Sequence, residues 1–103
     1  MSEDKHIQHY MVEFSVPSPF PQDLYEIIPY QRVSVNDLFT AGKLISYTLS
    51  MDMTRLWAVF VASTESELIT LVDKLPLSQY MDYNYSELRF HQSLKLLPAM
   101  SLN

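Results

Sequence analysis

Two side chains near the start of the chain have the chemistry of a general base and its acid partner. Glu13 and His9 lie in the segment HYMVEFSV at 9–16. A carboxylate or imidazole within hydrogen-bond reach of an acidic C–H can take up and return a proton, and burial raises a carboxyl pKa toward the range that a base needs. We expect Glu13 to be the base, with His9 as its partner, if this face lines a cavity. The alternative is that Glu13 faces solvent or pairs with Arg55 or Arg89, and that His9 is a half-exposed surface residue.

Four aromatic residues are candidates for binding a substrate. Their rings and hydroxyl groups can line a cleft that offers both apolar surface and hydrogen-bond donors. Aromatic side chains also favour strands for packing reasons alone, so sheet core or a subunit interface is the alternative. The four residues are Tyr47, Trp57, Tyr83 and Tyr85.

Gln31 and Arg32 are further candidates because they follow an irregular point in a helical segment. Apolar residues recur at helical spacing between residues 22 and 41, and Gly42 supplies the stop. Pro29 removes one helical hydrogen bond and collides with the preceding turn, so the sequence predicts a kink or two shorter helices. Gln31 and Arg32 would then line a ligand cleft. The alternative is a simple repacking where the helix begins.

Several chemistries have little support in the sequence. His6 and His9, with Glu3 and Asp4 nearby, do not make a closed set of metal ligands. The chain has no cysteine, and its single glycine, Gly42, excludes a glycine-rich phosphate loop. We therefore expect no metal and no cofactor.

The composition predicts one soluble domain. The chain has 103 residues, 48% of them hydrophobic, and a formal charge of -5 that argues against nucleic acid as a partner. No apolar run reaches the roughly 18 to 20 residues of a membrane helix, and the acidic N-terminus does not resemble a signal peptide. We expect no membrane association and a cytoplasmic location. The predicted organisation is a flexible tail at 1–8, a domain at 9–95 and a C-terminal tail at 96–103.

Hydrophobic periodicity divides this domain into six elements. Apolar and polar residues alternate in the first strand, and the third strand is apolar on both faces. In the second helix, Thr64 and Glu67 have the spacing of a capping box in which the Glu67 carboxylate bonds back to the Thr64 backbone. The predicted elements are strands at 9–16, 44–52, 55–63 and 81–91 and helices at 22–41 and 65–75, the second strand with Ile45, Tyr47 and Leu49 on one face and Leu44, Ser46 and Thr48 on the other.

The order strand, helix, strand, strand, helix, strand is that of an α+β, ferredoxin-like βαββαβ domain. Such a domain has an antiparallel four-stranded sheet with two helices on one face. The other face would expose apolar side chains, and a sheet-to-sheet homodimer, a dimeric α/β barrel, would bury them. The alternative is that the first helix or a tail covers this face.

The segment LPLSQYMD at 75–82 resembles the LPLxPYMD segment of the muconolactone isomerase family. The segments YMVEFSVP, AGKLISYTL and LWAVFVASTESEL resemble that family's first strand, its glycine turn into the second strand, and its third strand with the following helix cap. The resemblance spans roughly residues 10 to 90. It implies a dimeric barrel, often assembled into larger rings.

The resemblance also implies a reaction. Members of the family move a double bond within an unsaturated lactone, converting muconolactone to the enol-lactone of 3-oxoadipate, without metal or cofactor, and relatives eliminate chloride from chlorinated lactones. An ungapped alignment places the family's glutamate on Gln31, its lysine on Arg32 and its histidine near Met53. Glutamine cannot act as a base, so any proton transfer here must use other groups.

These observations leave three functional hypotheses. The first is an isomerase-like, cofactor-free enzyme that shifts a proton on a lactone or related unsaturated acid with rearranged acid–base residues. The second is a dimeric-barrel protein that binds a small ligand or serves assembly without catalysis. The third is a cofactor-independent monooxygenase, since an aromatic pocket can hold an oxidisable substrate. Fold alone does not decide among them.

Overall fold

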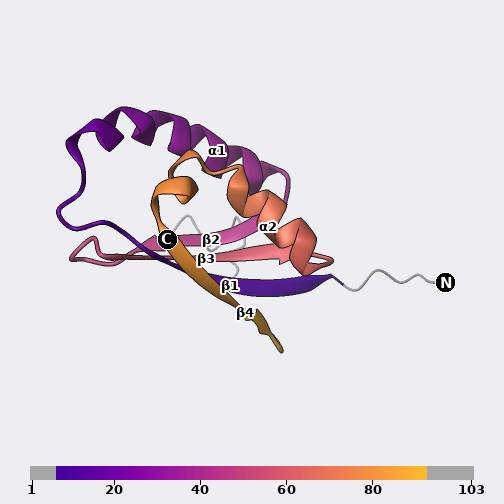
Figure 1. The fold of residues 1–103 in the computed structure, drawn as a ribbon. Helices are drawn as coiled ribbons and strands as arrows, with labels where there is room; N and C mark the ends of the chain where they lie inside the picture. The colour runs from indigo at the N-terminus through magenta and orange to yellow at the C-terminus, as the bar shows by residue number, and fades with distance from the viewer. Residues whose placement is uncertain (1–6, 93–103) are drawn as a thin grey trace, which may run out of the picture.

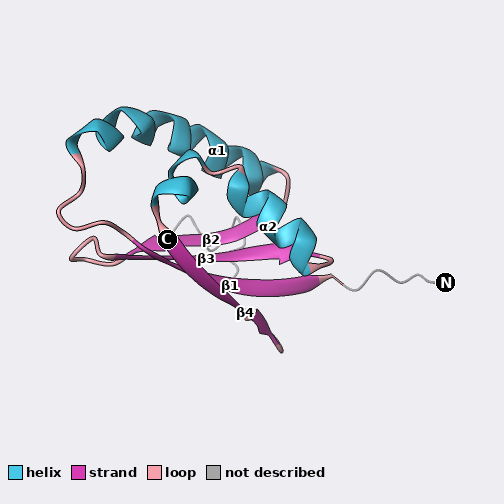
Figure 2. Ribbon diagram, viewed as in Figure 1, coloured by secondary structure: helices cyan, strands magenta, loops and turns pink. Residues whose placement is uncertain are grey.

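The computed structural model describes residues 7–92 and shows the predicted α+β arrangement (Figure 1). One sheet carries two helices and two short 3-10 helices (Figure 2). In chain order the elements are β1 (Gln8–Ser15), η1 (Gln22–Ile27), α1 (Ile28–Thr40), β2 (Leu44–Leu49), β3 (Arg55–Ala62), α2 (Glu65–Asp73), η2 (Pro76–Tyr80) and β4 (Asp82–Leu88). The tails predicted at 1–8 and 96–103 lie almost entirely outside the described residues, and β1 already begins at Gln8.

The sheet is antiparallel, with the strand order β2-β3-β1-β4. The central strand β1 pairs with β3, where Glu13 lies opposite Trp57, and with β4, where Glu13 lies opposite Asn84. Because side chains alternate across a strand, this register decides which residues face the helices and which face away.

The helices lie together on one face of the sheet (Figure 1). The hydrophobic core fills the layer between the helices and the sheet. Side chains from β1 and β3 make the floor of this core, and α1 and α2 make its roof. Its most buried members are Tyr10, Val12, Phe14, Leu44, Ala58, Phe60, Leu68, Val72 and Leu75. Burial of this apolar layer is the main driving force for the fold.

Pro29 divides the first helical segment into two elements, as predicted. The 3-10 helix η1 ends at Ile27 and α1 begins at Ile28, which places Pro29 in the first turn of α1. A proline costs little there, since the N–H groups of a first turn have no partner within the helix. Phe39 belongs to the apolar residues at helical spacing but is 41% exposed, whereas Gln31 lies on the buried face of α1.

Gly42 ends α1 as the sequence predicts. It has a φ of 74°, its N–H donates to the Phe39 carbonyl at 3.0 Å, and the next N–H, of Lys43, donates to the Leu38 carbonyl at 2.9 Å. This is the Schellman arrangement, which favours glycine because the backbone is left-handed at this position.

One of the two hydrogen bonds predicted for the capping box of α2 is present. The Glu67 N–H donates to the Thr64 hydroxyl at 3.0 Å, but the Glu67 carboxylate accepts from the Ser63 N–H, at 2.8 Å, rather than from Thr64. Glu67 also binds Lys43 at 3.1 Å. The Glu67 side chain thus connects the start of α2 to the end of the α1–β2 turn.

The predicted alternation of β2 is wrong at its start. The register between β2 and β3 shifts between Leu44 and Ser46, which is the mark of a bulge. Leu44 is therefore buried on the helix side, the side on which Tyr47 and Leu49 also lie, while Ile45 is 39% exposed. Leu44 and Ile45 are both apolar, so the sequence does not indicate which of the two a bulge places on the helix side.

No helix of residues 7–92 covers the other face of the sheet (Figure 1). By register, Met11, Trp57, Val59 and Val61 lie on this face, with Glu13 among them. We call it the open face because no described helix covers it, although Val59 is only 1% exposed. The face is mixed in character, since Ser46 and Thr48 of β2 lie opposite Val59 and Trp57.

Candidate ligand-binding site

A cavity of ≈ 500 Å³ lies between the helical layer and one end of the sheet. This volume is within the usual range for small-molecule sites. Most of its wall is apolar and comes from η1, α1, β2, η2 and the segments after β1. The lining residues are Val16, Phe20, Tyr25, Ile28, Gln31, Arg32, Val35, Asn36, Tyr47, Leu49, Met53, Leu56, Leu77 and Met81.

Gln31 is the polar residue fixed most firmly in this wall. It lies on the buried stripe of α1 with Val35 and Leu38, at helical spacing, and only 4% of it is exposed. Its Oε1 accepts from the Leu77 N–H at 2.9 Å, and its Nε2 donates to the Tyr47 hydroxyl at 2.8 Å. Gln31 therefore joins α1 to β2 and to η2.

Leu77 determines how the Gln31 amide is oriented. Its N–H lies in the first turn of η2, where backbone donors lack partners within the helix. A buried N–H requires an acceptor, so the oxygen of the Gln31 amide must face Leu77 and the nitrogen must face Tyr47. If the amide were turned the other way, the Gln31 Nε2 and the Leu77 N–H, which are both donors, would face each other.

The orientation of Gln31 in turn determines the role of Tyr47. Since the Tyr47 oxygen accepts from Gln31, the hydroxyl hydrogen is directed to another acceptor, and none is found among residues 7–92. Burial raises the pKa of Tyr47, although the hydrogen bond from Gln31 opposes this shift. Tyr47 is thus a protonated hydrogen-bond donor at neutral pH, in the wall of the cavity.

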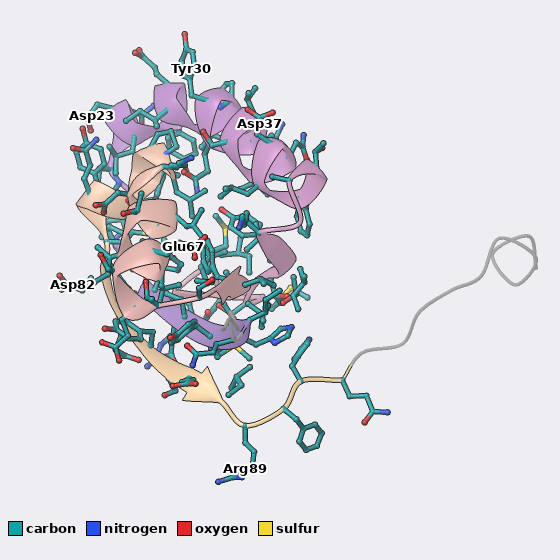
Figure 3. All side chains as sticks on the ribbon, turned by 90° about the vertical axis from the view of Figure 1, so that its right-hand side faces the viewer. Asp23, Tyr30, Asp37, Glu67, Asp82 and Arg89 are labelled. Carbon is teal, nitrogen blue, oxygen red and sulfur yellow. The ribbon has the colours of Figure 1, made fainter. Side chains whose placement is uncertain are left out.

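The described lining contains one full charge, that of Arg32. It includes no carboxylate and no imidazole. Asp23 and Asp37, two exposed carboxylates of the helical layer (Figure 3), are not part of the lining. The cavity wall therefore favours an anion, although the chain as a whole has a charge of -5.

Met53 forms part of the cavity rim from the turn between β2 and β3. Its φ is 64°, the left-handed region that residues other than glycine rarely adopt. The turn is held by the Met53 N–H, which donates to the Ser50 carbonyl at 3.0 Å, and by Asp52, which accepts from the Thr54 N–H at 3.1 Å. Hydrogen bonds from Ser50 and Thr54 lower the pKa of Asp52. Methionine at this position carries no sequence signal for a left-handed backbone.

The structure brings three of the predicted binding residues together in one cavity: Gln31, Arg32 and Tyr47. The sequence reasoning missed Asn36, Met53 and the backbone N–H of Leu77. The sequence did carry one signal for the site, which is Gln31, a polar residue among the apolar residues of the buried stripe of α1.

The other three predicted binding residues lie elsewhere. Trp57 is on the open face of the sheet, opposite Glu13. Tyr83 packs against Phe14 with ring centroids 5.4 Å apart, and the Tyr85 hydroxyl lies 3.3 Å from the Glu65 carboxylate. These positions match the alternative of sheet packing, and a role in binding stays a prediction for all three.

Glu13 and His9 also lie outside the cavity, on the open face of the sheet. Glu13 forms an ion pair with Arg55, and the His9 ring stacks on His91 with centroids 6.0 Å apart. The two residues are four positions apart on β1, which corresponds to roughly 13 Å along a strand. They cannot exchange a proton directly, and their predicted acid–base roles remain predictions.

The described part of the chain offers neither a metal site nor a membrane helix. Among residues 7–92, no group of three His, Asp or Glu side chains is placed to hold a metal ion. No helix in this range has the length and apolar character needed to cross a membrane.

The fold and the cavity define the chain as a ferredoxin-like α+β protein with a largely apolar cavity between its helices and its sheet. Comparison with protein families gives a match to the model described as muconolactone delta-isomerase, over residues 9–100. The chain belongs to this family, as the segment at 75–82 indicated. A comparison with curated proteins found no match.

Proposed function

We propose that the chain binds a small unsaturated lactone or a related unsaturated acid in the cavity beneath α1 and promotes a proton shift in it without a cofactor. The observation that carries this proposal is the Gln31–Tyr47 pair in a largely apolar wall. Family membership supports the class of substrate.

Tyr47 and Arg32 supply the polar contacts in this proposal. The Tyr47 hydroxyl donates to the ligand carbonyl, and Arg32 balances a carboxylate. A hydrogen bond to the carbonyl makes the adjacent C–H more acidic, because the negative charge that develops on the oxygen is stabilised. Water takes the proton from carbon and returns it at the far end of the double bond, so that the reaction is balanced without a protein carboxylate.

The homodimer expected from the sequence is part of the same proposal. The open face presents Met11, Trp57 and Val61 as apolar surface for a second copy. Pairing of two such faces would form the dimeric α/β barrel, and larger rings would be built from these dimers. It would also enclose Glu13 and His9, which lie on the face of the sheet opposite to the cavity.

A pair of matched substitutions on β2 tests the location of the site. Leu49 lines the cavity and is 49% exposed, whereas Ile45 on the same strand is 39% exposed and is not part of the lining. We expect Leu49→Trp to abolish binding of muconolactone, followed by NMR line broadening, and Ile45→Trp to leave it unchanged. Equal binding by both variants would place the site elsewhere.

Proton exchange separates catalysis from binding alone. In deuterated buffer, an isomerase-type protein makes the lactone proton next to the carbonyl exchange at a higher rate than it does in buffer alone. A protein that binds muconolactone without exchange would have the second function considered, a non-catalytic ligand-binding protein. The specific observation that favours this second function is the lack of a carboxylate or imidazole in the described lining.

A further inference from the structure

The donor orientation of Tyr47 has a consequence for the kind of ligand that the cavity selects. We infer that the site binds the oxyanion form of small planar ligands, a phenolate or an enolate, in preference to the neutral form, with the anionic oxygen on the Tyr47 hydroxyl. This inference rests on the proposed function, since it names the ligand state that the same cavity prefers.

The first support is the chain of hydrogen bonds that ends at Tyr47. The Leu77 N–H fixes the Gln31 oxygen, the Gln31 nitrogen fixes the Tyr47 oxygen, and the Tyr47 hydrogen is left for a ligand. A donor held in advance loses little freedom on binding, and its hydrogen bond to a charged acceptor is about twice as strong as one to a neutral acceptor.

The second support is the charge of the wall. Arg32 is the one charged group in the described lining, and because it is exposed, its attraction for an anion depends on the salt concentration. An anionic ligand oxygen therefore meets a fixed donor and a nearby positive charge, and no carboxylate in this lining repels it.

The third support is what a carboxylate at position 31 would do. A glutamate with the same shape would accept from the Leu77 N–H with one oxygen and from the Tyr47 hydroxyl with the other. Tyr47 would then donate to this carboxylate rather than to the ligand, and a negative charge would stand beside it. With glutamine at this position, the Tyr47 hydroxyl therefore donates to the ligand and not to residue 31.

The experiment uses 4-nitrophenol, which ionises near neutral pH with a change in visible absorbance, and its methyl ether 4-nitroanisole, which cannot ionise. Each probe is titrated with the full chain, and binding is followed by NMR. We expect the ionisation of bound 4-nitrophenol to shift to lower pH than in free solution. The expected affinity for the phenolate exceeds that for 4-nitroanisole by about 10-fold or more, given the usual strength of a charged hydrogen bond.

Four variants separate the contributions. Tyr47→Phe and Gln31→Glu should both remove the shift, the second while keeping the fold because it is isosteric. Arg32→Met should weaken the binding of the phenolate and make this binding less dependent on salt. The ionisation of bound 4-nitrophenol should still shift to lower pH in this variant. Tyr30→Phe is the control, since Tyr30 is adjacent to Gln31 yet projects from the outer side of α1 and is 69% exposed (Figure 3).

The outcomes distinguish this inference from the proposed function. Equal binding of 4-nitrophenol and 4-nitroanisole, or a shift that persists in Tyr47→Phe, would overturn the oxyanion preference and leave the cavity as a ligand site. If neither probe nor muconolactone binds, both the inference and the proposed function fail.

Discussion

Gln31 and the backbone of Leu77 are 46 positions apart in the chain, and the side chain of one accepts the N–H of the other at 2.9 Å. This bond connects the buried face of α1 to the segment that most resembles the muconolactone isomerase family. It also turns the Gln31 amide so that Tyr47 becomes a donor toward the cavity.

Gln31→Leu should destabilise the fold. The substitution keeps the volume of the side chain but leaves the Leu77 N–H buried without an acceptor, and such a group costs about 1 to 3 kcal/mol. Urea unfolding followed by circular dichroism measures the change. Gln79→Leu is the control, because the Gln79 side chain is exposed and its one hydrogen bond within residues 7–92 is to the Pro76 carbonyl of its own turn, at 3.4 Å. Its effect should stay within about 0.5 kcal/mol. Equal effects would mean that the Gln31 bond adds nothing to stability.

Gln31→Glu should increase proton exchange on muconolactone. The carboxylate would stand where the family resemblance places its proton-transfer group, and a positioned base contributes on the order of 10²- to 10⁴-fold. Exchange of the lactone proton in deuterated buffer, followed by NMR, gives the rate. Gln31→Leu serves as the inactive comparison. Because this carboxylate would also draw the Tyr47 hydrogen bond away from the ligand, a rate for Gln31→Glu no higher than that of the wild type would show that the added base does not outweigh the lost donor.

The elements of this fold could be predicted because their signals are local. Pro29 divides a helical segment, Gly42 supports a left-handed turn, and Thr64 caps a helix; each effect depends on residues within one or two turns. Alternation in β1 likewise follows from its own side chains.

The site was only partly predictable because its contacts are not local. Gln31, Arg32 and Tyr47 were named as binding residues, but their common cavity depends on the packing of α1 over β2. The bulge at Ile45 brings Leu44 and Tyr47 to the same face, and two adjacent apolar residues do not reveal it. A backbone donor such as Leu77 has no sequence signature at all, so its partnership with Gln31 required the structure.

Met53→Gly should weaken ligand binding with little loss of stability. Glycine accepts a φ of 64° without the steric cost of roughly 1 kcal/mol that methionine bears, and this gain offsets the chain entropy that glycine loses on folding. The apolar contact at the cavity rim disappears. Binding of 4-nitroanisole and thermal unfolding measure the two effects.

Met51→Gly is the matched control for this substitution. Met51 is in the same turn, is 99% exposed and does not line the cavity. It should keep the wild-type affinity for 4-nitroanisole and lose about 0.5 to 1 kcal/mol of stability. If both variants bind the ether as the wild type does, Met53 does not form part of the site.

Protonation of Glu67 should make the fold less stable at acid pH. The Ser63 N–H and the Lys43 ammonium lower the pKa of Glu67 from its ordinary value of 4.5. Because the folded pKa is the lower one, the stabilisation is complete above the unfolded value and is lost as pH falls through the folded value. Urea midpoints between neutral pH and pH ~3 follow this loss.

Glu67→Gln removes the titrating group and keeps the shape of the side chain. Its stability should change less with pH over the acid range than that of the wild type. Glu26→Gln, an exposed position on η1, is the comparison and should retain the wild-type acid profile. A wild-type profile in Glu67→Gln would assign the acid sensitivity to other carboxylates.

Trp57→Glu should prevent the proposed homodimer. Trp57 lies opposite Glu13 on the open face of the sheet, so the new carboxylate would add a like charge beside Glu13 and would have to be buried between two sheets. Sedimentation velocity at micromolar concentration measures the change, and we expect the dissociation constant to rise at least 10-fold, or about 1.4 kcal/mol. Ile69→Glu is the control, because Ile69 is a 40% exposed apolar residue on α2, in the layer away from this face. A wild-type protein that sediments as a monomer, or a Trp57→Glu dimer as stable as that of Ile69→Glu, would exclude the open face as the interface.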